Sequence, residues 1–179
     1  MMNNYVFIDS QNLFKTFEKL ELKLDMKKLF TYLVDNLKAD KVFLFLGYIS
    51  TKKKFYEDLE KIGYVLIFRP VVKNKDGYKA NVDCDVVLHL ITEIDNYGKA
   101  ILITNDGDYF NTIKYLIGNN KFKNVISPER NTCSKLLRKV CQNKIIFCDD
   151  ILDYITQNAL DKPEHLEELP TPLGQELIL

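Results

Sequence analysis

The sequence predicts an α/β domain in which an open parallel sheet lies between two layers of helices. Short runs rich in β-branched and aromatic residues alternate with longer segments of helical character. Two of the runs, residues 42–46 and 100–103, are wholly apolar, as expected for strands covered on both faces. Right-handed crossovers would then place the carboxyl ends of all strands along one edge of the sheet.

Each expected element follows from this alternation. The strands are expected at residues 5–9, 41–47, 64–69, 99–104, 122–126 and 144–148. The helices are expected near residues 11–20, 25–38, 51–62, 81–96, 109–118, 130–142 and 149–158. The pattern contains no internal repeat and no second domain.

A change in composition marks the end of the expected domain. Residues 161–179 contain three prolines, five acidic residues and one lysine. We therefore expect one domain over residues 1–160 and a Pro-containing acidic C-terminal tail over residues 161–179, which is either a packed extension or a docking peptide. Its last residues, Leu-Ile-Leu, could bury against a second copy, so the sequence permits a homodimer.

Composition excludes several classes of protein. No apolar run approaches the roughly 18–20 residues that a membrane helix needs, and no basic–apolar–small segment typical of a signal peptide opens the sequence. The four cysteines form no Cys-x-x-Cys pair and the two histidines lie far apart, so we expect reduced thiols, no zinc site and a cytoplasmic protein. The chain has 25 basic and 25 acidic residues; subtracting the tail's one and five leaves 24 and 20, which permits an anionic substrate.

Acidic residues stand where two of the expected strands end. Asp9 closes the first strand, and Asn12 follows on the first turn of the next helix. Asp106 and Asp108 follow the fourth strand at the start of another helix. Asp106 and Asp108 could each serve only as a helix cap. Asp9 is harder to explain in that way, because an apolar strand gains no stability from an inward acid at its end.

A third acidic segment lies at the start of the helix expected at residues 81–96. At about 100° per residue, the apolar side chains of this helix form one stripe, which includes Val86 and Leu90. Asp83 falls on that stripe, and Asp85 falls on the opposite side. We therefore expect Asp83 to point toward the end of the sheet and Asp85 to point toward solvent or a flank.

The three segments would bring Asp9, Asp83 and Asp106 to one edge of the sheet. Carboxylates crowded together repel and raise each other's pKa, and a divalent cation removes that cost. Oxygen ligands without cysteine or histidine select Mg²⁺ or Mn²⁺. An open α/β sheet also places its ligand site outside the strand C-termini. The sequence thus predicts a magnesium or manganese site at this edge.

Three segments in order, residues 7–12, 79–83 and 104–109, resemble the NYN family of PIN-like nucleases, the group that includes LabA-like proteins. The resemblance implies a PIN-like parallel sheet, divalent metal binding and hydrolysis of RNA phosphodiester bonds. The residues that match the family's motifs are Asp9, Asn12, Asp83, Asp106 and Asp108.

The segments also depart from the family's pattern. Ala80 stands where glycine is usual, and Thr104 and Asn105 replace a usual Ser-Gly. Tyr109 replaces phenylalanine, and His89 stands where many relatives have another acid. None of these changes removes an expected metal ligand, but Asn105 alters the loop beside the metal.

We interpret the four aspartates as both catalytic residues and metal ligands, holding one or two ions directly or through water. Such ions activate water and offset charge on the phosphate. Asp108 would be the fourth acid or would orient a water, and Asn12 and Thr104 would fix the carboxylates from behind. No histidine lies near these segments, so we assign no side chain as general base.

Basic and aromatic residues near the same edge predict contact with single-stranded RNA. Arg69 and Lys79 are the candidate substrate-binding residues. Weaker candidates are Lys52, Lys53, Lys54, Lys73 and Lys75 for phosphates, and Tyr48, Tyr78 and Tyr109 for bases. Any of these side chains could instead be ordinary surface or packing residues.

Other α/β classes fit less well. A receiver domain needs an acid at the end of the third strand, where this chain has Arg69. A phosphatase with an aspartyl nucleophile needs an acid at position 11, which is Gln11, and a dinucleotide-binding domain needs glycines after the first strand. The alternative that remains is a non-catalytic, metal- or RNA-binding regulatory module of the same fold.

Overall fold

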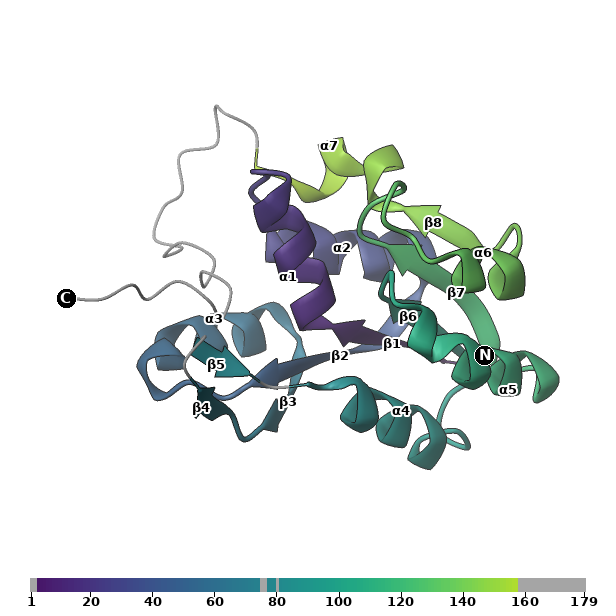
Figure 1. The fold of residues 1–179 in the computed structure, drawn as a ribbon, viewed down its shortest axis with the longest axis horizontal. Helices are drawn as coiled ribbons and strands as arrows, with labels where there is room; N and C mark the ends of the chain where they lie inside the picture. The colour runs from purple at the N-terminus through teal and green to yellow at the C-terminus, as the bar shows by residue number, and fades with distance from the viewer. Residues whose placement is uncertain (1–2, 75–76, 80, 158–179) are drawn as a thin grey trace.

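The computed structural model of the chain describes residues 3–74, 77–79 and 81–157, with side chains described outside residues 72–80. A six-stranded sheet with the order β3-β2-β1-β6-β7-β8 forms its centre (Figure 1). Every neighbouring pair of strands in this sheet is parallel. The predicted open α/β architecture is confirmed, whereas the boundary at residue 160 and the tail at 161–179 lie outside the described residues.

All six predicted strands are present. They are β1 (Asn4–Asp9), β2 (Ala39–Gly47), β3 (Val65–Arg69), β6 (Lys99–Ile103), β7 (Phe122–Ser127) and β8 (Ile145–Phe147). The α-helices are α1 (Ser10–Lys19), α2 (Met26–Leu37), α3 (Lys53–Ile62), α4 (Asp83–Thr92), α5 (Phe110–Gly118), α6 (Lys135–Cys141) and α7 (Leu152–Ile155). Short 3-10 turns are η1 (Ser50–Lys52), η2 (Gly107–Tyr109) and η3 (Cys148–Asp150).

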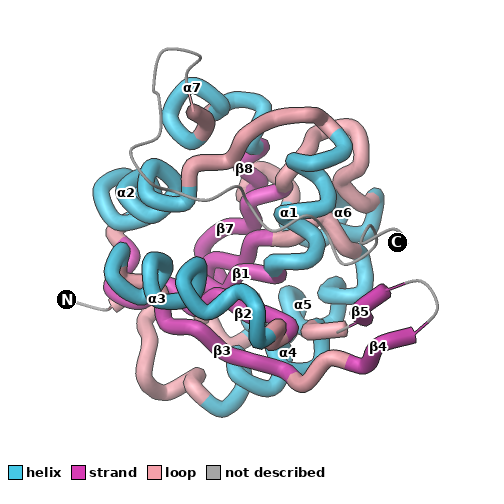
Figure 2. The backbone as a smooth tube through the Cα atoms, turned by 90° about the vertical axis from the view of Figure 1, so that its left-hand side faces the viewer, coloured by secondary structure: helices cyan, strands magenta, loops and turns pink. Residues whose placement is uncertain are grey.

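Alternation along the strands divides the core into two layers. Val6 and Ile8 of β1 are fully buried on the face covered by α1, α2, α3 and α7. Tyr5 and Phe7 of the same strand are buried on the other face, beneath α4, α5 and α6. Figures 1 and 2 show α2 and α4 on opposite sides of the sheet. Both faces are covered, which explains why the strands read as continuous apolar runs.

The strand order reverses between β1 and β6. The chain builds outward from β1 through β2 to β3, then crosses back and builds outward in the other direction through β6, β7 and β8. Parallel α/β sheets bind ligands at such a switch in strand order, outside the carboxyl ends of the strands. Here Ile8 pairs with Ile103, so Asp9 and Thr104 come next to each other at the switch.

Two local predictions were wrong. No strand or helix was expected between residues 69 and 81, but this segment contains an antiparallel pair, β4 (Val72–Asn74) and β5 (Gly77–Lys79). Asp76-Gly77 is a typical hairpin dipeptide, but the strands beside it are only three residues long, too short to show an alternating pattern. The helix expected at 130–142 begins only at residue 135, because the Ser134 hydroxyl caps it by accepting the Leu136 N–H.

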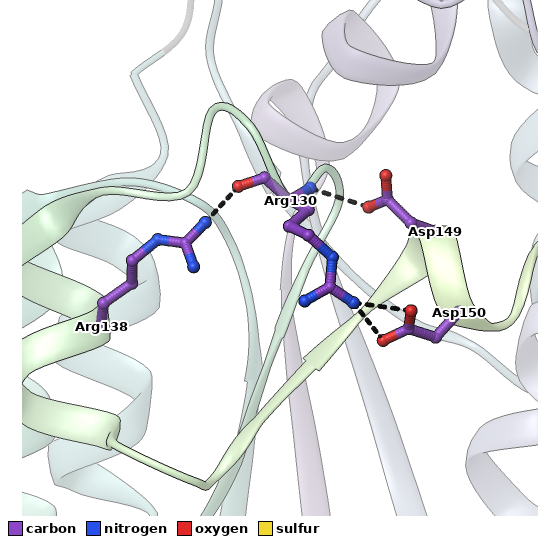
Figure 3. Close-up of polar contacts among 4 residues, drawn as sticks. All are labelled: Arg130, Arg138, Asp149 and Asp150. Atoms are coloured by element: carbon purple, nitrogen blue, oxygen red, sulfur yellow. Dashed lines mark hydrogen bonds and ion pairs between the residues drawn. The ribbon is translucent and has the colours of Figure 1, made fainter.

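A polar cluster fastens the segment between β7 and α6 to the end of β8 (Figure 3). The Arg130 guanidinium donates to both carboxylate oxygens of Asp150, at 2.6 and 2.7 Å, and lies 4.0 Å from the ring centroid of Phe147. Its backbone N–H donates to Asp149 at 2.7 Å, and its carbonyl accepts from Arg138. The cluster therefore fixes one end of a segment whose other end reaches the candidate site.

Candidate active site

Asp9 is a buried carboxylate at the end of β1, only 3% exposed. One oxygen accepts the Asn12 N–H at 3.2 Å and so caps α1. The other faces the Thr104 hydroxyl at 3.4 Å, longer than an ordinary O–H···O hydrogen bond. Burial, with smaller contributions from the charges of Asp83 and Asp106, raises the pKa of Asp9 to about 7 against the opposing effect of the hydrogen bond from Asn12. Each carboxylate oxygen of Asp9 thus has one partner, and the contact from Thr104 is long.

Tyr109 lies among the three carboxylates. Its ring is 1% exposed, and its hydroxyl donates to the Asp83 carboxylate at 3.1 Å. Burial and then the charges of Asp9, Asp83 and Asp106 hold the pKa of Tyr109 well above its ordinary value. The phenol therefore stays protonated and donates. A buried ring cannot stack on a nucleotide base, so the prediction that Tyr109 contacts RNA in that way was wrong.

Asp106 begins the turn that follows β6. Its backbone N–H donates to the Thr104 hydroxyl at 3.1 Å, and its carboxylate accepts the Asp108 N–H at 2.9 Å. Asp106 therefore caps η2, as its position after a strand allowed, and its charge still reaches Asp9. The side chain of Asp108 is exposed on the same turn. The structure brings Asp9, Asp83 and Asp106 together and leaves Asp108 at the rim.

Asn12 ties the first helix to the turn after β6. Its side-chain oxygen accepts the Asn105 N–H at 2.9 Å. The Asn105 side chain in turn donates to the Thr132 hydroxyl at 2.7 Å, and the Asn105 carbonyl accepts the Ser134 N–H at 3.1 Å. At Gly107, an added Cβ would lie 2.4 Å from the Ser134 hydroxyl. Asn105 is thus the link through which the fastened 128–134 segment supports this turn.

Of the two predicted substrate-binding residues, one is already paired. The Arg69 guanidinium lies 2.8 Å from the Asp85 carboxylate, and both side chains are partly exposed, at 40% and 37%. This pairing agrees with the expectation that Asp85 points to a flank rather than into the carboxylate cluster. The side chain of Lys79 lies outside the described residues.

The other residues noted in the sequence differ in their surroundings. His89 packs edge-on against Phe43 and Phe45, with ring centroids 5.1 and 5.5 Å away, so it lies between α4 and the core beneath that helix. Tyr48 remains 40% exposed after β2. The side chains of Lys73, Lys75 and Tyr78 lie outside the described residues.

Glu129 is an acidic residue that the sequence reasoning missed. It follows β7 at the same edge of the sheet, is 7% exposed, and has one carboxylate oxygen with no partner among the described residues. Its carbonyl accepts a hydrogen bond of 3.0 Å from the Ser127 hydroxyl. The available signal was its place just after a predicted strand, the same signal that identified Asp106.

The donor chemistry of the cluster fits a hard divalent cation. Asp9, Asp83 and Asp106 offer oxygen donors only, and a cation would relieve the burial and repulsion that raise the pKa of Asp9. In the part of the chain that the structure describes, no three or more His, Cys, Asp and Glu side chains form a group that could hold a metal ion. Mg²⁺ commonly keeps several waters and uses only one or two carboxylates, so the cluster fits a hydrated ion better than a closed cage.

Comparison with known proteins gives the family. The profile of the NYN domain matches residues 3–153. The chain belongs to the NYN domain family. This match confirms the resemblance seen in the three sequence segments. NYN domains have a PIN-like nuclease fold and are generally hydrolases.

Two individual proteins are similar to this NYN domain, one in sequence and one in fold. It is 20% identical over 169 residues to the low amplitude and bright protein LabA of Synechococcus elongatus, covering 88% of this chain and 90% of that protein. Its fold matches the crystal structure of a protein of unknown function from Vibrio parahaemolyticus with a TM-score of 0.70 and 18% identity, covering 86% of this chain and 96% of that one. Among the described helices of the NYN domain, none has the length and apolar character to cross a membrane.

Proposed function

We propose that this NYN domain is a divalent-metal-dependent ribonuclease that hydrolyses phosphodiester bonds of single-stranded RNA. One observation carries the proposal: at the switch point of the sheet, the buried Asp9 carboxylate lies close enough to Asp83 and Asp106 for their charges to raise its pKa. A stable fold gains nothing from a buried carboxylate beside two others, and such groups gather where a cation or a reaction requires them. The nuclease character of the family supports the same activity.

The proposed ligands of Mg²⁺ or Mn²⁺ are Asp9, Asp83 and Asp106, with the exposed Asp108 as a fourth acid that acts directly or through water. When bound, the ion supplies an activated water and offsets charge on the phosphate. Glu129 is a further carboxylate at this edge, and because one of its oxygens has no partner among the described residues, we include it among the residues to be substituted.

The remaining residues of the site hold these acids in place. The Tyr109 hydroxyl holds Asp83, and the Asn12 N–H and Thr104 hydroxyl hold Asp9. Partners of this kind restrict the rotation of a carboxylate, and removing them typically lowers metal affinity or activity about 10–100-fold. Arg69 and Lys79 are the proposed phosphate contacts; Arg69 is part-exposed and has N–H donors beyond the one nearest Asp85.

The decisive experiment incubates the pure protein with end-labelled single-stranded RNA and Mn²⁺, and in parallel with a chelator. We expect fragments only with the metal, and no fragments from Asp9→Asn or Asp106→Asn. Asp35→Asn is the matched control, because Asp35 is exposed near the end of α2, at the edge of the sheet where the strands begin. Equal cleavage by wild type and Asp106→Asn would overturn the proposal, since it would trace the activity to a contaminant or to other residues.

A second candidate is a non-catalytic module that binds metal or RNA without cleavage. It is favoured by the lack, among the described residues, of a group of three ligands set for one ion. RNA that is bound and stays intact with Mn²⁺ in the same assay would establish this alternative. Calorimetric titration of Mn²⁺ into wild type, Asp9→Asn and Glu129→Gln would then show whether the cluster still binds the ion.

A further inference from the structure

Two part-exposed aromatic rings form a surface near the candidate site. Tyr48 and Phe68 are each 40% exposed, and their ring centroids lie 5.4 Å apart at 86°. Behind them is the buried ring of Tyr56, 5.8 Å from Tyr48 and 4.8 Å from Phe68. The Tyr56 hydroxyl accepts the Ile49 N–H at 3.0 Å and donates to the Gly47 carbonyl at 3.3 Å. The two outer rings, which we name the Tyr48–Phe68 platform, therefore sit on a fixed support.

The platform lies at the same edge of the sheet as the aspartates. Asp9 pairs with Phe45 on β2, and Gly47 pairs with Arg69 on β3, so Tyr48 and Phe68 stand at the carboxyl ends of β2 and β3, which follow one another on one side of β1. The Tyr48 N–H donates to the Arg69 carbonyl at 2.9 Å, which joins these two strand ends. The platform lies on the α3 side of this edge, because Phe68 aligns with Leu46 and packs on Tyr56, whereas alternation after Phe7 directs Asp9 toward α4. A bound strand would therefore cross the edge of the sheet to reach the aspartates.

Positive charge borders the platform. Lys52 ends η1 and Lys53 begins α3, directly after the segment that carries Tyr48. Lys53 is exposed and Lys52 is partly exposed. Exposed aromatic rings beside lysines match a nucleic acid strand whose bases are unpaired, because each base offers a face for stacking and each nucleotide a phosphate. An apolar protein partner would leave the lysines without a counterpart, and paired bases in a duplex have no free face.

We infer that the Tyr48–Phe68 platform binds unpaired bases of a single strand whose backbone continues toward the aspartates. The inference rests on the proposed function for its direction, yet it concerns binding rather than cleavage. Stacking involves contact with the faces of the bases and not with the ribose 2′-hydroxyl, so single-stranded DNA of the same sequence should bind the platform as well. The platform would thus select strandedness, while the aspartates act on the phosphodiester bond.

The chain contains no tryptophan, so a single introduced indole reports directly on stacking. Tyr48→Trp and Phe68→Trp are titrated with a short oligoadenylate in chelator, and their fluorescence should be quenched in a saturable way. Tyr115→Trp is the control, because Tyr115 is 48% exposed on α5. A blunt duplex should quench less than the single strand. Equal quenching of all three variants, or none at the platform, would overturn the inference.

Binding of the same strand by alanine variants gives the second measurement. Tyr48→Ala and Phe68→Ala should each weaken it by about 5- to 100-fold, the range for loss of one stacked base. Tyr48→Phe should retain it, and thermal melting checks that every variant is folded. Folded alanine variants with unchanged affinity would contradict the platform. An indole shift that depends on protein concentration without nucleic acid would instead assign this surface to self-association.

The experiments distinguish failure of the proposed nuclease activity from failure of the proposed platform. Quenching without cleavage in Mn²⁺ would leave the platform and remove the nuclease. Cleavage without quenching would leave the nuclease and remove the platform. The absence of both would remove both.

Discussion

The hydroxyl of Tyr109 donates a hydrogen bond of 3.1 Å to the carboxylate of Asp83. The two residues belong to different segments, the turn after β6 and the first turn of α4, and this bond joins them beside Asp9. The hydroxyl thus adds one directed contact to a proposed metal ligand.

Tyr109→Phe tests that contact while keeping the buried ring. We expect a loss of about 1.5–3 kcal/mol in the free energy of unfolding, the usual value of a hydrogen bond to a charged group. Without the bond Asp83 rotates more freely, so Mn²⁺ affinity measured by calorimetry should fall about 10-fold. Unchanged affinity together with unchanged stability would contradict a positioning role for the hydroxyl.

Asp9 should make the metal-free protein less stable as the pH rises. Its pKa is raised from the ordinary 3.8 to about 7, so between these values the unfolded chain has released a proton that the folded chain still holds. Stability therefore falls through this window, by a total on the order of 4 kcal/mol above pH 7. Melting temperatures in chelator from pH 4.5 to 8 measure the slope, and Asp9→Asn should lack this component. Equal slopes in the two proteins would refute it.

A divalent ion should reverse this loss. Binding to the folded state alone raises stability with the logarithm of free ion concentration, by about 2.7 kcal/mol at 100 times the dissociation constant. Mn²⁺ should therefore raise the melting temperature more at pH 8 than at pH 5, because an ionised Asp9 binds the cation better. Asp85→Asn should keep the effect and Asp9→Asn should lose it. The same shift in both variants would place the ion elsewhere.

Gly107→Ala should disturb the turn that carries Asp106. The new methyl carbon would lie 2.4 Å from the Ser134 hydroxyl oxygen, which must rotate and give up its cap on α6. We expect a loss of about 1–3 kcal/mol. In the double variant with Ser134→Ala the two costs should be less than additive, since the clashing atom is gone. Chemical denaturation of the four proteins of this cycle measures the coupling, and strict additivity would show that the turn avoids the clash in another way.

Much of the fold was open to prediction because its signals are local. Apolar runs marked all six strands of the main sheet, and helical periodicity separated Asp83 from Asp85 before any contact was known. Asp9 was identified because an apolar strand has little reason to end in an inward acid.

The rest depended on contacts between distant segments. The pairing of Arg69 with Asp85 joins β3 to α4, and no local pattern indicates which acid an arginine meets. Tyr109 looked like an aromatic residue at an element end, although the packing of α5 and α6 around it buries it completely. The unpartnered oxygen of Glu129 likewise depends on what surrounds it rather than on its neighbours in the chain.

The reversal of strand order has a practical consequence. Strands β1, β2 and β3 come from the first half of the chain and β6, β7 and β8 from the second, and the two halves of the sheet meet along β1 and β6. A chain divided between β4 and β5 would leave Asp9 on one fragment and Asp83 with Asp106 on the other. Neither fragment alone would hold the complete set of acids, so recovered activity on mixing would be a direct signal that the two pieces had reassembled.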